Sequence, residues 1–256
     1  MSGTRLAAGV ALLLAAAASG ADRPVTTFPP AFDSAEWTAL LSKYVDGRGL
    51  VDYAAWKADA ADRRRLAAYL GRFGARGERE AMTDAGRIAV LVNAYNAFIV
   101  ETILAHYPVD SIRSIPGAFT AKEHRIGGVR YSLDEIEHTA VRLGGYRVHA
   151  TIVCASRSCP PLDRRAYEAS DLFAHADARM EAWMARPDLY RFDPEADVVR
   201  LPKYFDWYRS DFEKEGIPAV LARHAPARHR AWLSRGRFRT AFLDYDWSLN
   251  APLPPR

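Results

Sequence analysis

Apolar residues recur at helical spacing over much of the chain. Within residues 34–45, tryptophan, leucine and tyrosine side chains fall on one face, which predicts a helix. The same spacing predicts a second helix at about 53–73 and a longer one at about 84–107, which Pro108 ends. A further helix is predicted at about 166–185, and two short helices are predicted nearer the C-terminus.

Shorter segments carry strand signals. Residues 123–132, around Gly127-Gly128, predict a hairpin, and apolar pairs at 190–192 and 198–201 flank an acidic turn. Residues 238–247 alternate between apolar and polar side chains, which predicts a closing strand. Because predicted helices outnumber strands, the fold class is α+β, with a single, mostly helical domain packed on a small antiparallel or mixed sheet.

The N-terminus has the pattern of a secretory signal peptide. Arg5 precedes an apolar run from Leu6 to Ala18, and Ser19-Gly20-Ala21 supplies the small residues of a cleavage site before Asp22. We therefore expect an exported protein, periplasmic or secreted. No later stretch approaches the roughly 20 apolar residues of a membrane-spanning helix, so no membrane span is expected.

The remaining chain divides into three parts. Residues 22–33 are rich in proline and predict an extended entry, residues 34–250 form the domain, and residues 251–256 form a C-terminal tail. Charged residues make up 26% and hydrophobic residues 49%, as in ordinary globular proteins. The net charge is +4, but the basic residues are spread along the chain without a recognition motif, so nucleic-acid binding is not expected. We also expect no cofactor, and the sequence leaves the oligomeric state open.

Two asparagines interrupt the apolar surface of the longest predicted helix. Asn93 and Asn96 are spaced three residues apart and share a face that predicts burial. Buried amides need partners. They either bond neighbouring backbone and fix its shape, or line a pocket where they orient a ligand or a catalytic group. Tyr95, between them, belongs to the core or to such a pocket.

A second polar group follows the hairpin. Ser132 and Glu135 form a capping box that opens a helix, and His138 lies one turn after Asp134 and Glu135. A carboxylate of this helix, Glu135 or Glu137, would therefore orient the imidazole and fix its tautomer. The alternatives are an exposed histidine without a role, or metal binding through Glu135 and His138.

Both cysteines lie in one segment. The β-branched run at 147–153 predicts a buried strand, after which Cys154 and Cys159 are spaced C-x4-C. In an exported protein a disulfide is the first explanation, and a functional thiol, a metal site and an inert pair are the alternatives. On a strand His149 and Cys154 would face opposite sides, which makes His138 the more plausible base for a Cys154 thiol.

Two aromatic clusters complete the candidate residues. They lie at 201–208 and 245–250, and each carries an aspartate beside a tryptophan. Their aromatic side chains predict core packing, while Asp246 and Asn250 in the second cluster would rim a pocket.

These motifs together closely resemble the domain-of-unknown-function family 547 (DUF547). The resemblance rests on pieces spread over residues 93–250, namely Asn93–Asn96, Gly127-Gly128, Tyr131–His138, Arg147–His149, Cys154–Pro160, Phe205–Tyr208 and Tyr245–Asn250. It implies one α+β domain, often exported in bacteria, and no established activity. The order of elements is also loosely similar to papain-like and transglutaminase-like enzymes, although their central helix begins with the cysteine and this one carries asparagines.

Three functions are consistent with these residues. The first is a thiol-dependent hydrolase or acyltransferase acting on amide or peptide-like bonds. In it Cys154 is the nucleophile, His138 the base, one helix glutamate orients the base, and Asn93 or Asn96 donates to the oxyanion.

The second is a non-catalytic binding module for a small-molecule or peptide-like ligand, with a Cys154–Cys159 disulfide that shapes a pocket floored by the two asparagines. The third is a metal-dependent enzyme that uses His138, His149 and carboxylates. The candidate binding residues are Tyr95, Asn96, His149, Cys159, Asp246 and Asn250.

Overall fold

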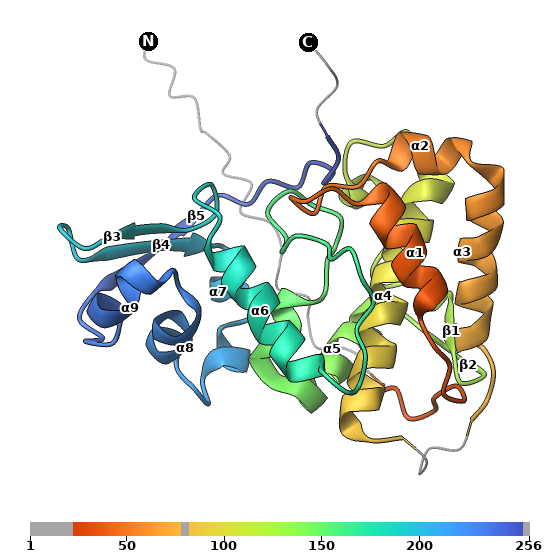
Figure 1. Ribbon diagram of the computed structural model, residues 1–256, viewed down its shortest axis with the longest axis horizontal. Helices are drawn as coiled ribbons and strands as arrows, with labels where there is room; N and C mark the ends of the chain where they lie inside the picture. The colour runs from red at the N-terminus through yellow and green to blue at the C-terminus, as the bar shows by residue number, and fades with distance from the viewer. Residues whose placement is uncertain (1–22, 78–81, 253–256) are drawn as a thin grey trace, which may run out of the picture.

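Helix α4 (Asp84–His106) runs through the larger of two hydrophobic clusters in the computed structural model, which describes residues 23–77 and 82–252 (Figure 1). The predicted signal peptide lies outside the described residues, as does most of the predicted C-terminal tail. Nearly every side chain of the central part of α4 is buried. Its predicted bounds are confirmed to within one residue.

Helices α2 (Tyr53–Ala58), α3 (Ala60–Phe73) and α5 (Leu133–Gly144) pack against α4, and α1 (Ala35–Tyr44) packs against α2 and α3. The prediction of one continuous helix at 53–73 is wrong, because the chain breaks at Asp59. The Asp59 carboxylate accepts hydrogen bonds from the amides of Ala61 and Asp62, both at 3.0 Å, and so caps α3 at its own start.

The second cluster contains the C-terminal part of the chain, on the left in Figure 1. Its helical elements are α6 (Leu172–Met184), α7 (Tyr204–Trp207), the 3₁₀ helix η4 (Arg209–Phe212), α8 (Ile217–His224) and α9 (Ala227–Leu233). Helix α6 begins six residues later than predicted, after an irregular segment that crosses α1 and α4.

The strands form two small sheets. The predicted hairpin is confirmed as β1 (His124–Ile126) and β2 (Val129–Tyr131), an antiparallel pair with Ile126 opposite Val129. In the second sheet β4 (Val198–Pro202) lies between β3 (Arg191–Asp193), which is antiparallel to it, and β5 (Arg239–Leu243), which is parallel. Helices dominate, so the α+β fold class is confirmed.

The predicted buried strand at 147–153 is wrong. Residues Gly145–Ala150 form a 3₁₀ helix, η3, and residues 152–154 that follow it are irregular. Val148, Ile152 and Val153 are buried as expected. A short run of buried β-branched residues therefore marked the burial of this segment correctly but not its backbone conformation.

By length and composition α4 also meets the criterion for a membrane-crossing helix, although no such stretch was expected after the leader. In its most apolar window, 78% of the residues are buried inside the structure. That degree of burial is typical of the core helix of a globular protein.

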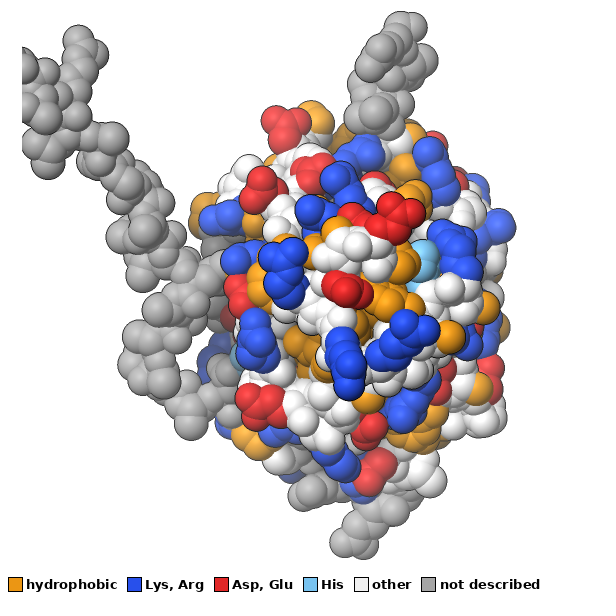
Figure 2. Space-filling model, turned by 90° about the vertical axis from the view of Figure 1, so that its left-hand side faces the viewer, with side chains coloured by type: hydrophobic (Ala, Val, Ile, Leu, Met, Phe, Trp, Pro, Cys, Tyr) orange, Lys and Arg blue, Asp and Glu red, His pale blue; other side chains and the backbone are white. Residues whose placement is uncertain are grey.

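Surface charge is dispersed on the face that β3–β5, α8 and α9 cover. Figure 2 shows Lys and Arg side chains across this face, with Asp and Glu between them and hydrophobic side chains showing in the gaps. This agrees with the even spread of basic residues along the sequence.

We predict that Ser132→Ala lowers the free energy of unfolding by about 1 kcal/mol, because both halves of the capping box of α5 are formed. Urea denaturation followed by circular dichroism measures this change. Ser170→Ala, at an exposed turn position before α6, is the matched control and should leave the midpoint unchanged. Equal stability of Ser132→Ala and wild type would contradict the prediction.

Candidate functional site

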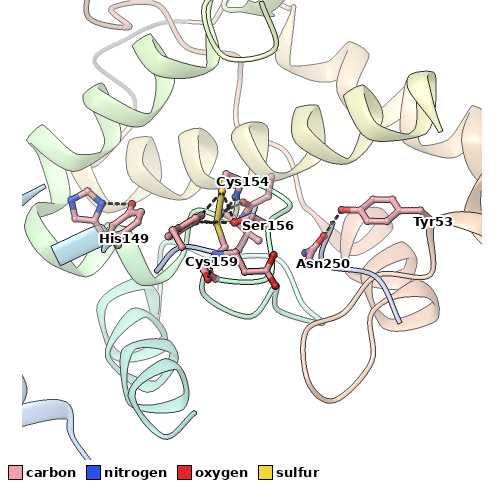
Figure 3. The surroundings of a disulfide bond; sticks show 12 residues. Tyr53, His149, Cys154, Ser156, Cys159 and Asn250 are labelled. Carbon is pink, nitrogen blue, oxygen red and sulfur yellow. Dashed lines mark hydrogen bonds between the residues drawn. A yellow bond between two sulfur atoms is a disulfide. The ribbon is translucent and has the colours of Figure 1, made fainter. Parts of the chain in front are cut away.

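The cysteine loop, residues 154–159, is closed by a disulfide between its two ends (Figure 3). The Cα atoms of Cys154 and Cys159 lie 6.4 Å apart, and the Cys154 amide donates to the Cys159 sulfur at 3.2 Å. The protein has no free cysteine in this state. The first interpretation of the C-x4-C spacing therefore describes the structure, and a thiolate is absent from the oxidised form.

The asparagines of α4 fix the backbone on either side of this loop. Asn96 donates to the Thr151 carbonyl at 2.8 Å and accepts from the Val153 amide at 2.9 Å, directly before the loop. Asn93 does the same with both backbone groups of Tyr167, at 2.8 and 2.9 Å. The prediction that both amides are buried with partners outside their helix is confirmed. Each side-chain amide uses one of its two N–H groups in these bonds, so donation to an oxyanion would rely on the remaining N–H alone.

A C-terminal strap, residues 245–251, runs antiparallel to the cysteine loop. The Arg157 amide donates to the Ser248 carbonyl at 2.9 Å, and the Asn250 amide donates to the Ala155 carbonyl at 3.0 Å. The predicted strand at 238–247 is therefore too long, because it ends at residue 243 and the chain leaves the sheet to form the strap. Ala155 has a φ of 61°, which is uncommon for a residue with a side chain.

The side chains of Asp246 and Asn250 shape the strap. Asp246 accepts from the amide of Ser248 at 2.9 Å and from its hydroxyl at 2.6 Å, while its own amide donates to the Ser158 hydroxyl at 2.9 Å. Asn250 accepts from the Tyr53 hydroxyl at 2.9 Å (Figure 3). Both residues lie beside the cysteine loop, their described contacts are internal, and their expected place at the rim of a pocket stays a prediction.

Tyr245, the first residue of the strap, brings a hydroxyl to the disulfide. Its oxygen lies 3.2 Å from the Cys159 sulfur, 3.5 Å from the Cys154 sulfur and 2.8 Å from the Ser156 hydroxyl. Burial raises the pKa of Tyr245 above its usual range; the Ser156 hydrogen bond lowers the pKa, and the charge of Glu137 raises it. Tyr245 therefore contacts the disulfide and also lies in the electric field of a carboxylate on α5.

That carboxylate, Glu137, is buried among tyrosines. Its charge is the largest cause that raises the pKa of Tyr208, followed by burial of the ring and a hydrogen bond to Glu137. Burial raises the pKa of Tyr95 and of Tyr204, and the charge of Glu137 is the next cause for both. Four phenols, including that of Tyr245, thus stay protonated around one carboxylate, and sequence reasoning had assigned two of its members, Glu137 and Tyr95, to the site.

His149 belongs to a different network. It is fully buried, with Nδ1 2.7 Å from the Tyr204 hydroxyl and Nε2 2.9 Å from a carboxylate oxygen of Asp211. The rings of Tyr208 and Phe212 pack against it, with centroids 4.8 and 5.5 Å away. Figure 3 shows the imidazole turned away from the disulfide, so the expected separation of His149 and Cys154 is found, although their segment is not a strand.

The other residues of α5 are placed as follows. Glu135 accepts from the Ser132 amide at 2.9 Å and from the Lys122 ammonium at 2.8 Å. Burial raises its pKa, but the Lys122 and Ser132 hydrogen bonds outweigh this effect and the net pKa is lowered. Its carboxylate is thus engaged in the cap. His138 is half-buried on the same helix, and its pairing with Cys154 stays a prediction.

Sequence reasoning missed Ser156 and Asp211, and it assigned the aromatic clusters that contain Tyr208 and Tyr245 to the core. The aromatic density of the segments around Tyr208 and Tyr245 was the available signal, but only the fold shows that their hydroxyls converge on Glu137 and the disulfide. Among residues 23–77 and 82–252, no group of three or more His, Cys, Asp or Glu side chains is arranged to hold a metal ion.

Comparison with known proteins gives one family. Residues 79–184 match the family described as "Protein of unknown function, DUF547", which supports the resemblance drawn from the motifs. The match covers α4, α5, the cysteine loop and α6, but ends before the 205–208 and 245–250 motifs. No curated protein and no solved structure matches the chain.

We predict that Asn93→Ala and Asn96→Ala each lower the free energy of unfolding by about 1–3 kcal/mol, because each leaves a buried backbone amide and carbonyl without partners. Native-state hydrogen exchange localises the effect. Asn93→Ala should speed exchange of the Tyr167 amide and Asn96→Ala that of Val153, so each variant is the control for the other. Unchanged exchange at both amides would contradict the prediction that the two asparagines hold these backbone groups.

Proposed function

We propose that this protein is an exported, non-catalytic binding module for a small-molecule or peptide-like ligand. The observation that carries the proposal is the Cys154–Cys159 disulfide, which occupies both sulfurs and holds a loop that contributes to a surface pocket. Exported proteins form and keep such bonds because their compartment is oxidising. In the oxidised state the chain offers a fixed binding surface without a nucleophilic sulfur.

The pocket beside the cysteine loop has a volume of about 520 Å³, which is in the range of small-molecule sites. Arg157 and Pro161 of the loop region line it, together with the turn at residues 47–50 and the end of α6. A smaller pocket of about 270 Å³ lies beside Asn93 and Tyr167. Asn93 alone of the two asparagines lines this second pocket, so a pocket floored by both is not present there.

A second candidate is the thiol-dependent hydrolase or acyltransferase, which requires reduction of the disulfide. The hydroxyls of Ser156 and Tyr245, 3.3 and 3.5 Å from the Cys154 sulfur, favour it because both could donate hydrogen bonds to a thiolate. His138 would act as the base, as expected from the sequence. This reaction would start only after an external reductant has cleaved the Cys154–Cys159 disulfide.

The first prediction of the proposal concerns thiol content. Protein purified from the exporting host and unfolded without reductant should show no free thiol, and addition of dithiothreitol should release the two cysteine thiols. Reaction with a chromogenic disulfide reagent measures both values. Two free thiols before reduction would refute the disulfide-held binding module and favour the hydrolase.

The second prediction concerns stability. The double variant Cys154→Ser, Cys159→Ser should lose about 2 kcal/mol of unfolding free energy, because the bond closes a short loop. Chemical denaturation of the double variant and of untreated wild type gives the difference, and reduced wild type should match the double variant.

For the hydrolase, reduced wild type should cleave p-nitroanilide or thioester substrates while reduced Cys154→Ser does not. Activity of reduced wild type that Cys154→Ser abolishes would displace the binding-module proposal. No cleavage by the reduced protein would contradict the hydrolase.

A further inference from the structure

The pocket beside the cysteine loop carries an unusual concentration of arginine. Four of its lining residues are arginines, and they come from three separate parts of the chain: Arg48, Arg157, Arg179 and Arg186. Asp188 is the one carboxylate among the residues that line it. From this lining we infer that the pocket is a binding site for a small molecule that carries two or more oxyanion groups. The inference rests on the proposed binding function and specifies its ligand class.

The walls of the pocket are held together by close contacts. Gly49, with a φ of 77°, packs so tightly that a Cβ added there would lie 2.5 Å from the Cβ of Pro161. Only glycine fits this approach, which brings the turn bearing Arg48 against the cysteine loop. From the opposite side, Arg179 donates to the Pro161 carbonyl at 2.9 Å and ties α6 to the same point. The arginines are therefore presented by a preformed scaffold.

The carboxylates nearby compensate these arginines only in part. Arg186 pairs with Asp188, and Arg179 lies 3.3 Å from Asp163, which is also 2.6 Å from His175. The Asp163 carboxylate is therefore shared between Arg179 and a histidine.

The other two arginines are less compensated still. Arg48 lies 3.4 Å from Asp46 in a pair whose side chains are 76% and 38% exposed, so their attraction is weak. Among the described contacts, the Arg157 side chain donates to the carbonyl of Ala251, an uncharged acceptor. Arg157 therefore keeps its full positive charge at the pocket, along with most of its five N–H donors.

This arrangement selects a class of ligand. A guanidinium presents a planar fork of donors that matches the paired oxygens of a phosphate or a carboxylate. Because the arginines stand on three walls of a space of about 520 Å³, one small anion would reach only some of them. A molecule with two or more phosphate or carboxylate groups would contact several at once. Phosphorylated and polycarboxylate compounds share this chemistry.

Calorimetric titration of the purified exported protein at low ionic strength tests the inference. The probes are inorganic phosphate, pyrophosphate and citrate, with chloride at matched ionic strength as the blank. We expect saturable binding of pyrophosphate or citrate that is at least about tenfold tighter than that of phosphate, since more guanidinium groups are engaged. Comparison of pyrophosphate with citrate separates phosphate ligands from carboxylate ligands.

Variants locate the site. Arg157→Gln should weaken binding of the preferred probe by about tenfold or more, while Arg157→Lys, which keeps the charge but not the fork, should give an intermediate loss. Arg200→Gln removes the same charge from an exposed position on β4 and should bind like wild type. Circular dichroism and thermal unfolding verify that each variant is folded. If Arg157→Gln is misfolded, Arg48→Gln, at an exposed position on the turn at residues 47–50, takes its place in the same comparison.

Two outcomes would overturn the inference: no saturable binding of any probe by wild type, or equal losses in Arg157→Gln and Arg200→Gln. Either result, obtained with protein whose sulfurs are bonded, leaves the binding-module proposal in place with a different ligand. Conversely, tight citrate or pyrophosphate binding by protein with free thiols would support the arginine site and refute the disulfide-held module.

Discussion

The structure depends first on the two carboxamides that α4 carries into the core. A buried helix has no spare backbone groups, so an irregular segment packed against it would leave its own amides and carbonyls without partners. Asn93 and Asn96 supply those partners, each with one donor and one acceptor, at Tyr167 and at Thr151 and Val153. Residues 151–153 can therefore lie in the core without being part of a sheet, and the cysteine loop begins from a fixed position.

The rest of the site is assembled from segments far apart in the sequence. The strap at 245–251 runs alongside the cysteine loop. Asn250 also accepts hydrogen bonds from the Tyr53 hydroxyl and the Val51 amide, which connect the strap to the N-terminal helices. The disulfide limits the motion of the loop from within, while the strap limits it from outside. Arg157, which lines the pocket, and Ser156, which contacts Tyr245, are thus held by the same two constraints.

The sequence was sufficient for the elements that local patterns define, such as α4, the hairpin and the capping box of α5. It was insufficient where tertiary contacts decide the conformation. The β-branched run around Ile152 has the composition of a strand, yet Asn96 satisfies its backbone in place of a sheet neighbour. Likewise the hydroxyl of Tyr245 reaches the disulfide only because the strap folds back. Burial and polar pairing were predictable at Asn93 and Asn96, but the identities of their partners were not.

The distribution of charge around the disulfide bears on which function it serves. On one side Glu137 lies among phenols, and its charge already raises the pKa of Tyr245, whose hydroxyl contacts both sulfurs. On the other side the loop contributes Arg157 to a pocket that attracts anions. Arginines beside a loop whose sulfurs are bonded thus favour the proposed binding of an anionic ligand over chemistry at Cys154.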